Sequence, residues 1–444
     1  MPELVGAEHV GPEHVAAAMT DAKVGIDTHG HHEASVSAAR SRVALATLRA
    51  VHGSRWTAFG TAVAVTVIGT VIGGLVLTAC SGGSHRASPE PTTTTPPATP
   101  GYRLDSTLRL NQIQVLGSHN SYHAEPYPQL LAELRQEHLG AVADSLDYGH
   151  RPLREQFDLG VRQIELDVYA DAKGGKYARS PTLEKLGIPA PDQTIMRAPG
   201  FKVMHEAFVD THSTCLTFVL CLRAVKTWSD AHRGHVPMMI DVEMKDQVVT
   251  PKTFDALDAE IRSVLSPADL ITPDTVRGDD PSLGHAVRTR GWPTLGAVRG
   301  RVMFMLDNEN LAKIELTGHP SLRGRILFAP SAPGDGDAAV AKLNDPIADA
   351  AAIKAALAAN MLVRTRSDAD TVQARHDSTT MRQAALTGGA QFVSTDYEVP
   401  DPRFGPYVVR IPGGKPARCN PVTAPPTCRA TDVEDPRLLA TGAR

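Results

Sequence analysis

The chain has 444 residues and a formal net charge of −4 at pH 7. This charge balance argues against a nucleic-acid partner, because proteins that bind nucleic acids usually carry a strongly basic face. The length permits two or three domains, although a single α/β barrel can occupy about 250 residues or more.

The N-terminal part predicts a tail followed by a membrane anchor. Residues 1–55 begin without helical or strand periodicity and end in a basic stretch, which places this tail on the cytoplasmic side. Residues 56–80 carry an uncharged run that is long enough, at about 1.5 Å per residue, to span a bilayer of about 30 Å. The run ends in Leu77-Thr78-Ala79-Cys80, which resembles a bacterial lipobox, where the cysteine is lipidated and becomes the new N-terminus. An uncleaved signal anchor is the alternative, but a lipoprotein also explains the unpaired Cys80.

The features after the anchor predict an exported domain at the cell membrane. Residues 81–104 form a Pro/Thr-rich linker, which we expect to be extended and to hold the following domain off the membrane on the extracellular side. The four cysteines beyond Cys80 lie in two close pairs, which suits an exported protein with two small disulfide loops. The expected disulfides are Cys215–Cys221 and Cys419–Cys428.

Residues 105–405 predict the main domain, an α/β fold of the (β/α)8 barrel type. Short apolar runs alternate with helical segments, of which the clearest begins at Thr250-Pro251, and this alternation indicates a parallel sheet. A doubly wound open sheet is the alternative, but no GxGxxG or P-loop motif follows the first strand. The eight expected strands are 111–117, 161–168, 201–205, 236–243, 301–307, 325–329, 360–364 and 390–395; the other expected helices are 338–358 and 378–387.

Two segments fall outside the alternation. Residues 170–200 form a long insertion after the second strand, where we expect it to overhang the site, and long loops in that position are often functional. Residues 406–444 are proline-rich, and we expect them to be a C-terminal tail held by the second disulfide.

Polar side chains stand where four of the expected strands end, which is where active sites lie in parallel barrels. Glu165 and Asp167 are two residues apart on a strand, so both point to the same side, and Asp241 and Glu243 repeat this pattern. Carboxylates gathered in this way repel one another unless a cation lies between them. Salt bridges to nearby basic residues are the alternative, and the candidates are Arg162 and Lys245.

The gathered donors predict one bound Ca²⁺. All of them are hard oxygens, Asn120 can add a carbonyl oxygen, and no cysteine is nearby. This set fits calcium better than magnesium or manganese, and it does not fit zinc.

His119 and His205 supply groups for proton transfer near neutral pH. An oxygen-liganded divalent ion between two histidines suits attack on a phosphodiester. The ion neutralises phosphate charge and acidifies the attacking hydroxyl, while one histidine accepts a proton and the other protonates the leaving oxygen. The residues expected to bind substrate are Lys245, Arg364 and Arg366 at phosphate oxygens and Tyr397 against a sugar or inositol ring.

The chain resembles the calcium-dependent bacterial phosphoinositide phospholipase C family, a group of PLC-like phosphodiesterases that fold as TIM barrels. The resemblance covers roughly residues 105–405, in the order HN, ExD, a second histidine and then an acid near the fourth strand. The segments that carry it are Gly117–His123, Leu146–Tyr148, Gly160–Tyr169 and Gly291–Leu295.

The resemblance also implies roles for single residues. It implies His119 and His205 as the catalytic pair, and Lys245 with one arginine of Val363–Arg366 as the substrate-binding residues. The implied calcium ligands are Asn120, Glu165, Asp167 and Glu243, with Asp241 as a substitute for Glu243.

We therefore expect an exported, membrane-tethered, monomeric phosphodiesterase that cleaves phosphoinositides at a membrane surface. A glycerophosphodiester-type phosphodiesterase is one alternative, although that group uses a His-Arg pair where this chain has His119-Asn120. A non-catalytic surface lipoprotein that binds phosphodiesters is the other. The presence of both histidines and all of the acids favours the enzyme.

Overall fold

The computed structural model describes residues 101–441. The predicted tail, anchor and lipidation site at Cys80, and all but the last residues of the predicted linker, lie outside the described residues. Between residues 101 and 441 no helix is both long and apolar enough to cross a membrane.

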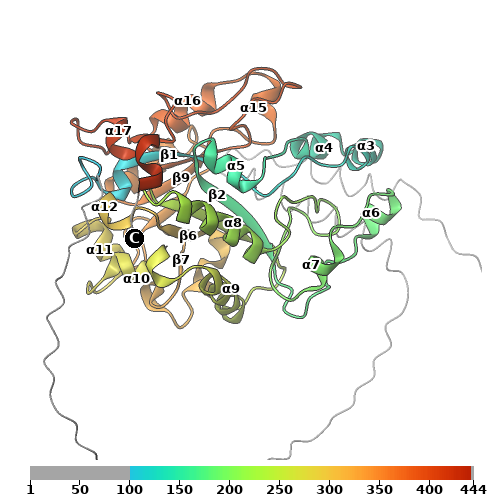
Figure 1. Cartoon of the computed structure of the whole chain (residues 1–444), viewed down its shortest axis with the longest axis horizontal. Helices are drawn as coiled ribbons and strands as arrows, with labels where there is room; N and C mark the ends of the chain where they lie inside the picture. Colours follow the sequence, from blue (N-terminus) through green and yellow to red (C-terminus); the bar gives the residue numbers. More distant parts are fainter. Residues whose placement is uncertain (1–100, 442–444) are drawn as a thin grey trace, which may run out of the picture. The chain divides into compact units, whose positions relative to one another are not determined.

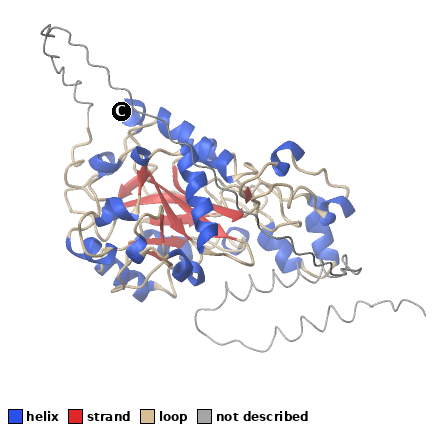
Figure 2. Ribbon diagram, turned by 90° about the horizontal axis from the view of Figure 1, so that it is seen from below, coloured by secondary structure: helices blue, strands red, loops and turns tan. Residues whose placement is uncertain are grey.

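A curled parallel sheet forms the centre of this unit, and helices surround it (Figure 2). A single parallel bridge between Pro330 and Val340 connects the two ends of the curl. The architecture is thus a mixed α/β fold with a TIM-like sheet. In sheet order the eight strands are β7 (Leu327–Phe328), β6 (Val302–Leu306), β4 (Met238–Met244), β2 (Val161–Tyr169), β1 (Ile113–Ser118), β10 (Phe392–Thr395), β9 (Leu362–Arg366) and β8 (Val340–Lys342); short β5 (Leu270–Ile271) also pairs with β6.

Two of the strand predictions need correction. The expected strand 201–205 is the two-residue β3 (Lys202–Val203), which pairs antiparallel with the end of β2 and does not join the parallel sheet. The eighth parallel strand is instead β8, in a stretch that we expected to be wholly helical because it is rich in alanine. The helix begins only at Ala350, since Asp345 turns the chain first by accepting hydrogen bonds from the backbone amides of Ile347 and Ala348.

Helices cover the outer face of the sheet, as the alternating pattern predicts (Figure 1). Helix α9 begins at the predicted Thr250-Pro251 signal and buries Phe254, Leu257 and Ile261 against the sheet. The helices are α3 (Pro128–Gln136), α4 (Gly140–Leu146), α5 (Leu153–Asp158), α6 (Pro181–Lys185), α7 (Gln193–Arg197), α8 (Phe218–Ala231), α9 (Pro251–Val264), α10 (Pro273–Arg277), α11 (Leu283–Thr289), α12 (Leu295–Val298), α13 (Ala312–Glu315), α14 (Ala350–Ala358), α15 (Val372–Arg375), α16 (Thr380–Thr387) and α17 (Ala430–Val433).

The long insertion and the segment after β1 form a small lobe. Helices α6 and α7 belong to the insertion, and α3 and α4 precede β2; all four lie beyond the C-terminal end of β2 in Figure 1. Leu130 and Leu134 of α3 share an apolar cluster with Leu183 of α6 and with Ile188. The lobe therefore has its own small core beside the edge of the sheet that carries the polar residues.

The segment after residue 405 is built into the fold, although we expected a tail. Strand β11 (Ala417–Cys419) pairs antiparallel with the start of β1. Glu434 is fully buried, and its Oε1 lies 2.5 Å from Nη2 of Arg162. The prediction of a tail was wrong because these contacts are made by backbone groups and by a charged pair. Neither kind of contact leaves a periodic pattern of apolar residues in the sequence. Both predicted disulfides, Cys215–Cys221 and Cys419–Cys428, are present.

Candidate active site

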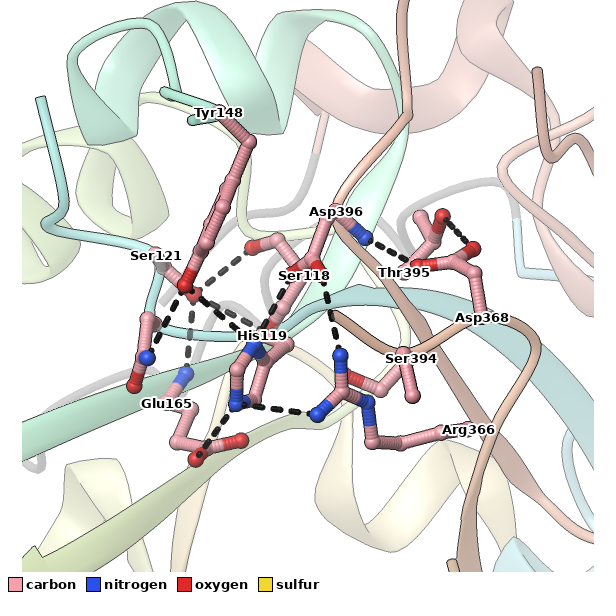
Figure 3. A network of polar contacts seen from close by, with 12 residues as sticks. Ser118, His119, Ser121, Tyr148, Glu165, Arg366, Asp368, Ser394, Thr395 and Asp396 are labelled. Carbon is pink, nitrogen blue, oxygen red and sulfur yellow. Dashed lines mark hydrogen bonds and ion pairs between the residues drawn. The ribbon is translucent and has the colours of Figure 1, made fainter. Parts of the chain in front are cut away.

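His119 follows the last residue of β1 and is fixed by residues at the ends of the next two strands of the sheet, β10 and β9. Its backbone amide donates to the carbonyl of Thr395 at 3.0 Å, and its Nδ1 lies 2.8 Å from Oδ1 of Asp396, just after β10. Nη1 of Arg366 lies 3.3 Å from Nε2, and Nη2 of the same arginine donates to Oδ2 of Asp396 at 2.9 Å (Figure 3). The ring is therefore held at both nitrogens.

The surroundings of His119 keep its imidazole neutral. Burial lowers the pKa of His119 well below its ordinary value, and the guanidinium charges of Arg366 and Arg364 lower it further. Because Asp396 accepts a hydrogen bond from Nδ1, that nitrogen carries the proton and Nε2 has the lone pair. A neutral imidazole whose Nε2 lone pair faces the site, where it meets the 3.3 Å contact with Arg366, is suited to accept a proton.

His205 is held by a second carboxylate, Asp210. Nδ1 of His205 lies 3.0 Å from Oδ2 of Asp210, and Nε2 of His123 lies 2.8 Å from the same oxygen. Burial lowers the pKa of His205, although the hydrogen bond to Asp210 opposes this. Burial alone would raise the pKa of Asp210, but His123 and His205 hold it below its ordinary range, so the carboxylate stays ionised between two imidazoles.

Three carboxylates meet at the neighbouring strands β2 and β4. Glu165, Asp167 and Glu243 bring one oxygen each to within 4.8 Å of one another, and we call this group the acidic triad. Glu243 stands opposite Asp167 in the parallel register of β2 and β4. Asp241 stands opposite Glu165 and belongs to a second group, with Glu165 and Asp307. Glu243, and not Asp241, thus converges with both Glu165 and Asp167.

The acidic triad fits a hard divalent cation. Asp167 is fully buried, and neither of its carboxylate oxygens has a hydrogen-bond partner within the described part of the chain. Burial and the nearby charge of Glu243 raise the pKa of Asp167 well above its ordinary value. Burial also raises the pKa of Glu165, to about 7. Buried carboxylates of this kind are stabilised by an ion that binds their oxygens.

Basic residues now balance the charge of these acids. Nζ of Lys245 lies 3.3 Å from Asp167 and 3.5 Å from Glu243, so the salt-bridge alternative describes this contact correctly. Arg364 is fully buried, and its Nη2 donates to Glu165. Arg162 instead pairs with Glu434 on the outer face of the sheet.

The remaining predicted residues lie around these groups. Asn120 has a positive φ of 44° and is buried beside the triad's strand, with Nδ2 donating to the Tyr148 hydroxyl at 3.0 Å. Tyr397 is only 2% exposed, with its ring edge-on to Tyr407 at 5.6 Å, so it is no open stacking platform. Arg364 likewise does not reach solvent, whereas Arg366 contacts His119 directly.

Sequence reasoning missed three residues of the site. Asp396 directly follows β10, so the rule that found His119 at the end of β1 would also have found it. Tyr148 follows α4 in a segment that carries the family resemblance, but no role was assigned to it, and Asp210 lies in an irregular loop without a sequence signal. A cavity of about 410 Å³ opens beside these residues; its lining includes Tyr148, His150, Asp396, Tyr397 and Arg403.

A curled parallel sheet that gathers histidines and carboxylates at the C-terminal ends of its strands is the plan of an α/β-barrel enzyme. Residues 108–421 match the family described as "Phosphoinositide phospholipase C, Ca2+-dependent". Because this match spans well over half of the chain, the chain belongs to that family. It is therefore an enzyme of the phosphoric diester hydrolase class, from a family that depends on Ca²⁺ and acts on phosphoinositides.

Several solved structures are similar to the chain. A calcium-dependent phosphoinositol-specific phospholipase C from a Gram-negative Pseudomonas species is 17% identical, with a TM-score of 0.47, and the match covers 72% of this chain and 98% of that one. A phosphatidylinositol-specific phospholipase C from Streptomyces antibioticus is 19% identical, with a TM-score of 0.42 and coverage of 65% and 95%. The enzyme from Listeria monocytogenes is 12% identical, with a TM-score of 0.39 and coverage of 66% and 90%. No curated protein matches the chain.

Proposed function

We propose that the chain is a phosphatidylinositol-type phospholipase C that cleaves phosphoinositides with one bound Ca²⁺ and two histidines. One observation carries the proposal: each imidazole has its own carboxylate, as His119–Asp396 and His205–Asp210, at the edge of the sheet that holds the acidic triad. We further infer that the curled sheet is a (β/α)8 barrel of the PLC-like phosphodiesterase type, supported by the bridge between Pro330, two residues after β7, and Val340 of β8.

Glu165, Asp167 and Glu243 would hold the ion, with Asn120 as a fourth ligand. Calcium takes about 6 to 8 oxygens, so water and the substrate would complete the shell. When bound, the ion supplies neutralisation of phosphate charge and acidification of the attacking hydroxyl. Magnesium and manganese fit less well, because a smaller ion demands stricter octahedral geometry than three flexible carboxylates impose.

The two histidines would move the protons. Nε2 of His119 accepts the proton of the attacking hydroxyl, and the Asp396 carboxylate stabilises the imidazolium that forms. The P–O bond to the leaving oxygen breaks, and this oxygen takes a proton from Nε2 of His205. Asp210 stabilises the protonated form of His205 before the transfer. Exchange with water then restores both histidines.

Basic residues would bind the phosphate or position the acids. Arg366 lies beside Nε2 of His119, where its guanidinium can also reach a phosphate oxygen, and Lys245 is 13% exposed at the triad. Arg364 would act through Glu165, which it holds in place. Tyr397 would shape the wall of the adjoining cavity.

We also propose that the enzyme is a monomer tethered to the cell membrane with its catalytic domain outside. The lipobox-like end of the anchor at Cys80 and the two disulfides support this location. Cys80→Ala should leave an unprocessed precursor, seen by intact mass. Processing identical to that of the wild-type chain would favour an uncleaved signal anchor instead.

The test of function is hydrolysis of a chromogenic inositol phosphodiester with calcium or with EGTA, followed by a panel of phospholipid headgroups. The proposal predicts calcium-dependent turnover and a preference for inositol headgroups. Preference for glycerophosphodiesters would identify the alternative activity, and the absence of turnover on every headgroup would leave a binding module.

A further inference from the structure

A second group of metal-ligating side chains lies beside the acidic triad. It consists of His123, His205 and Asp210, and we call it the His₂Asp cluster. One ligand atom from each residue lies within 4.8 Å of the others. Their exposures are 0%, 5% and 1%, so the cluster is a buried, converging set of two nitrogens and one carboxylate.

We propose that the His₂Asp cluster is a binding site for Zn²⁺, separate from the calcium site, and that zinc bound there inhibits the enzyme. Two imidazoles and a carboxylate, with a fourth position left for water, are a ligand set that zinc prefers. Calcium binds oxygens only, and the acidic triad offers no nitrogen. The two neighbouring sites therefore select different metals.

The geometry needs only a small adjustment to accept the ion. Oδ2 of Asp210 lies 2.8 Å from Nε2 of His123 and 3.0 Å from Nδ1 of His205. Ligands about 2.0–2.1 Å from a tetrahedral zinc are about 3.3 Å apart, so each histidine nitrogen must move away from Oδ2 of Asp210 by only a few tenths of an ångström. The two histidine nitrogens already lie within 4.8 Å of each other. Zinc then takes the place of the N–H proton on Nε2 of His123 and on Nδ1 of His205, and each ring carries its single proton on its other nitrogen.

The cluster can also rearrange without breaking other bonds. Nδ1 of His123 and Oδ1 of Asp210 are buried and have no hydrogen-bond partner within residues 101–441. When zinc takes the place of the hydrogen bond between Nε2 of His123 and Asp210, the His123 ring can therefore carry its proton on Nδ1, where no other hydrogen bond within the described residues is displaced. His205 is the most exposed member of the cluster, with a 7% exposed side chain.

Zinc at this site would remove a proton donor. A His205 ring bound through Nδ1 cannot become an imidazolium, so its Nε2–H is a far weaker acid than the protonated ring. This inhibitory effect rests on the proposed role of His205, whereas binding of the metal does not.

The experiment uses the purified full-length chain with saturating calcium. Co²⁺ replaces Zn²⁺ as a visible probe, because its absorption reports tetrahedral ligation by nitrogen and oxygen. We expect a cobalt band that zinc abolishes, together with zinc inhibition that a tenfold rise in calcium does not relieve. His123→Gln should remove the band and raise the half-inhibitory zinc concentration at least tenfold above that of the wild-type chain. The inhibition of each chain is measured relative to its own rate without zinc. The matched control is His212→Gln, because His212 contacts Glu125 and Tyr127 and not the cluster; it should change neither readout.

Three results separate the alternatives. If no cobalt band appears, or if His123→Gln leaves the band unchanged, the proposed site is wrong. The site is also wrong if added calcium relieves the zinc inhibition and His123→Gln does not change it, because zinc would then be binding at the acidic triad. A cobalt band without inhibition upholds the site and removes His205 from the proposed mechanism. If His123→Gln melts far below the wild-type chain, Asp210→Asn gives the same test with the carboxylate charge removed.

Discussion

Asp396→Asn probes how His119 is held for proton transfer. The carboxylate accepts from Nδ1 of His119 at 2.8 Å through one oxygen and from Arg366 at 2.9 Å through the other. An amide has a single acceptor oxygen, so its NH₂ group must face one of these two donors. The negative charge that would stabilise the imidazolium is lost as well.

The expected result of Asp396→Asn is a fall in kcat of about 10²–10⁴-fold, the range for a displaced acid or base. At about 1.4 kcal/mol for each factor of ten, this equals about 3–5 kcal/mol of transition-state stabilisation. KM should change much less, because Arg366 and the calcium ion proposed to bind at the triad would still meet the substrate's phosphate. The backbone should not move, since the Asp396 amide remains bonded to Asp368 at 2.8 Å.

The assay is steady-state hydrolysis of an inositol phosphodiester at saturating calcium, with the melting temperature recorded for each variant. The matched control is Asp401→Asn, which removes a carboxylate from the same segment but one that pairs with Arg403 and not with His119. Turnover of Asp396→Asn close to that of the wild-type enzyme and of the control would refute the reasoning.

Two further predictions concern histidines. His119→Ala and His205→Ala should each lower turnover by about 10²–10⁴-fold, and the double variant should be little worse than either single one, because both act in one reaction; additive losses would mean independent roles. His150 donates hydrogen bonds to Glu398 and to the His119 carbonyl. Burial alone would lower the pKa of His150, but these contacts outweigh burial and raise the pKa to about 8. Because the pKa of His150 is higher in the folded chain than the value of about 6.5 in the unfolded chain, protonated His150 stabilises the fold fully below about pH 6.5. This stabilisation is lost as the pH rises through about 8. Denaturant titrations of the wild type and of His150→Gln measure this effect. The difference between their free energies of unfolding should fall by about 2 kcal/mol over this pH range, and a difference that does not change with pH would contradict the raised pKa of His150.

The sequence was informative where a local rule connects a residue with the site. His119 lies at the end of an apolar strand, and Glu165 and Asp167 share a face by the two-residue period of a strand, so their convergence was predictable. The choice between Asp241 and Glu243 was not, because each stands opposite one of these two acids in the register of β2 and β4, and only the fold shows which oxygens converge.

Other features depend on contacts between distant segments. β8 carries three residues in an alanine-rich stretch, and only its pairing with β9 makes it a strand. Asp210 orients His205 from a loop without periodicity. Arg364 is buried against Glu165, which lies 199 residues away in the sequence. Its charge alone suggested a substrate contact, and only the fold shows that its partner here is Glu165.

The most direct test of the account is a calcium titration of turnover for the wild-type enzyme and for Asp167→Asn. Asn keeps the shape of Asp167 but removes one of the three triad charges, so calcium binds less tightly. We predict that the wild-type activity disappears in EGTA, that Asp167→Asn needs more calcium for half-maximal turnover, and that added calcium restores part of its rate. Wild-type turnover that EGTA leaves untouched, or a variant that only melts earlier and keeps the wild-type calcium response, would contradict the assignment of the acidic triad.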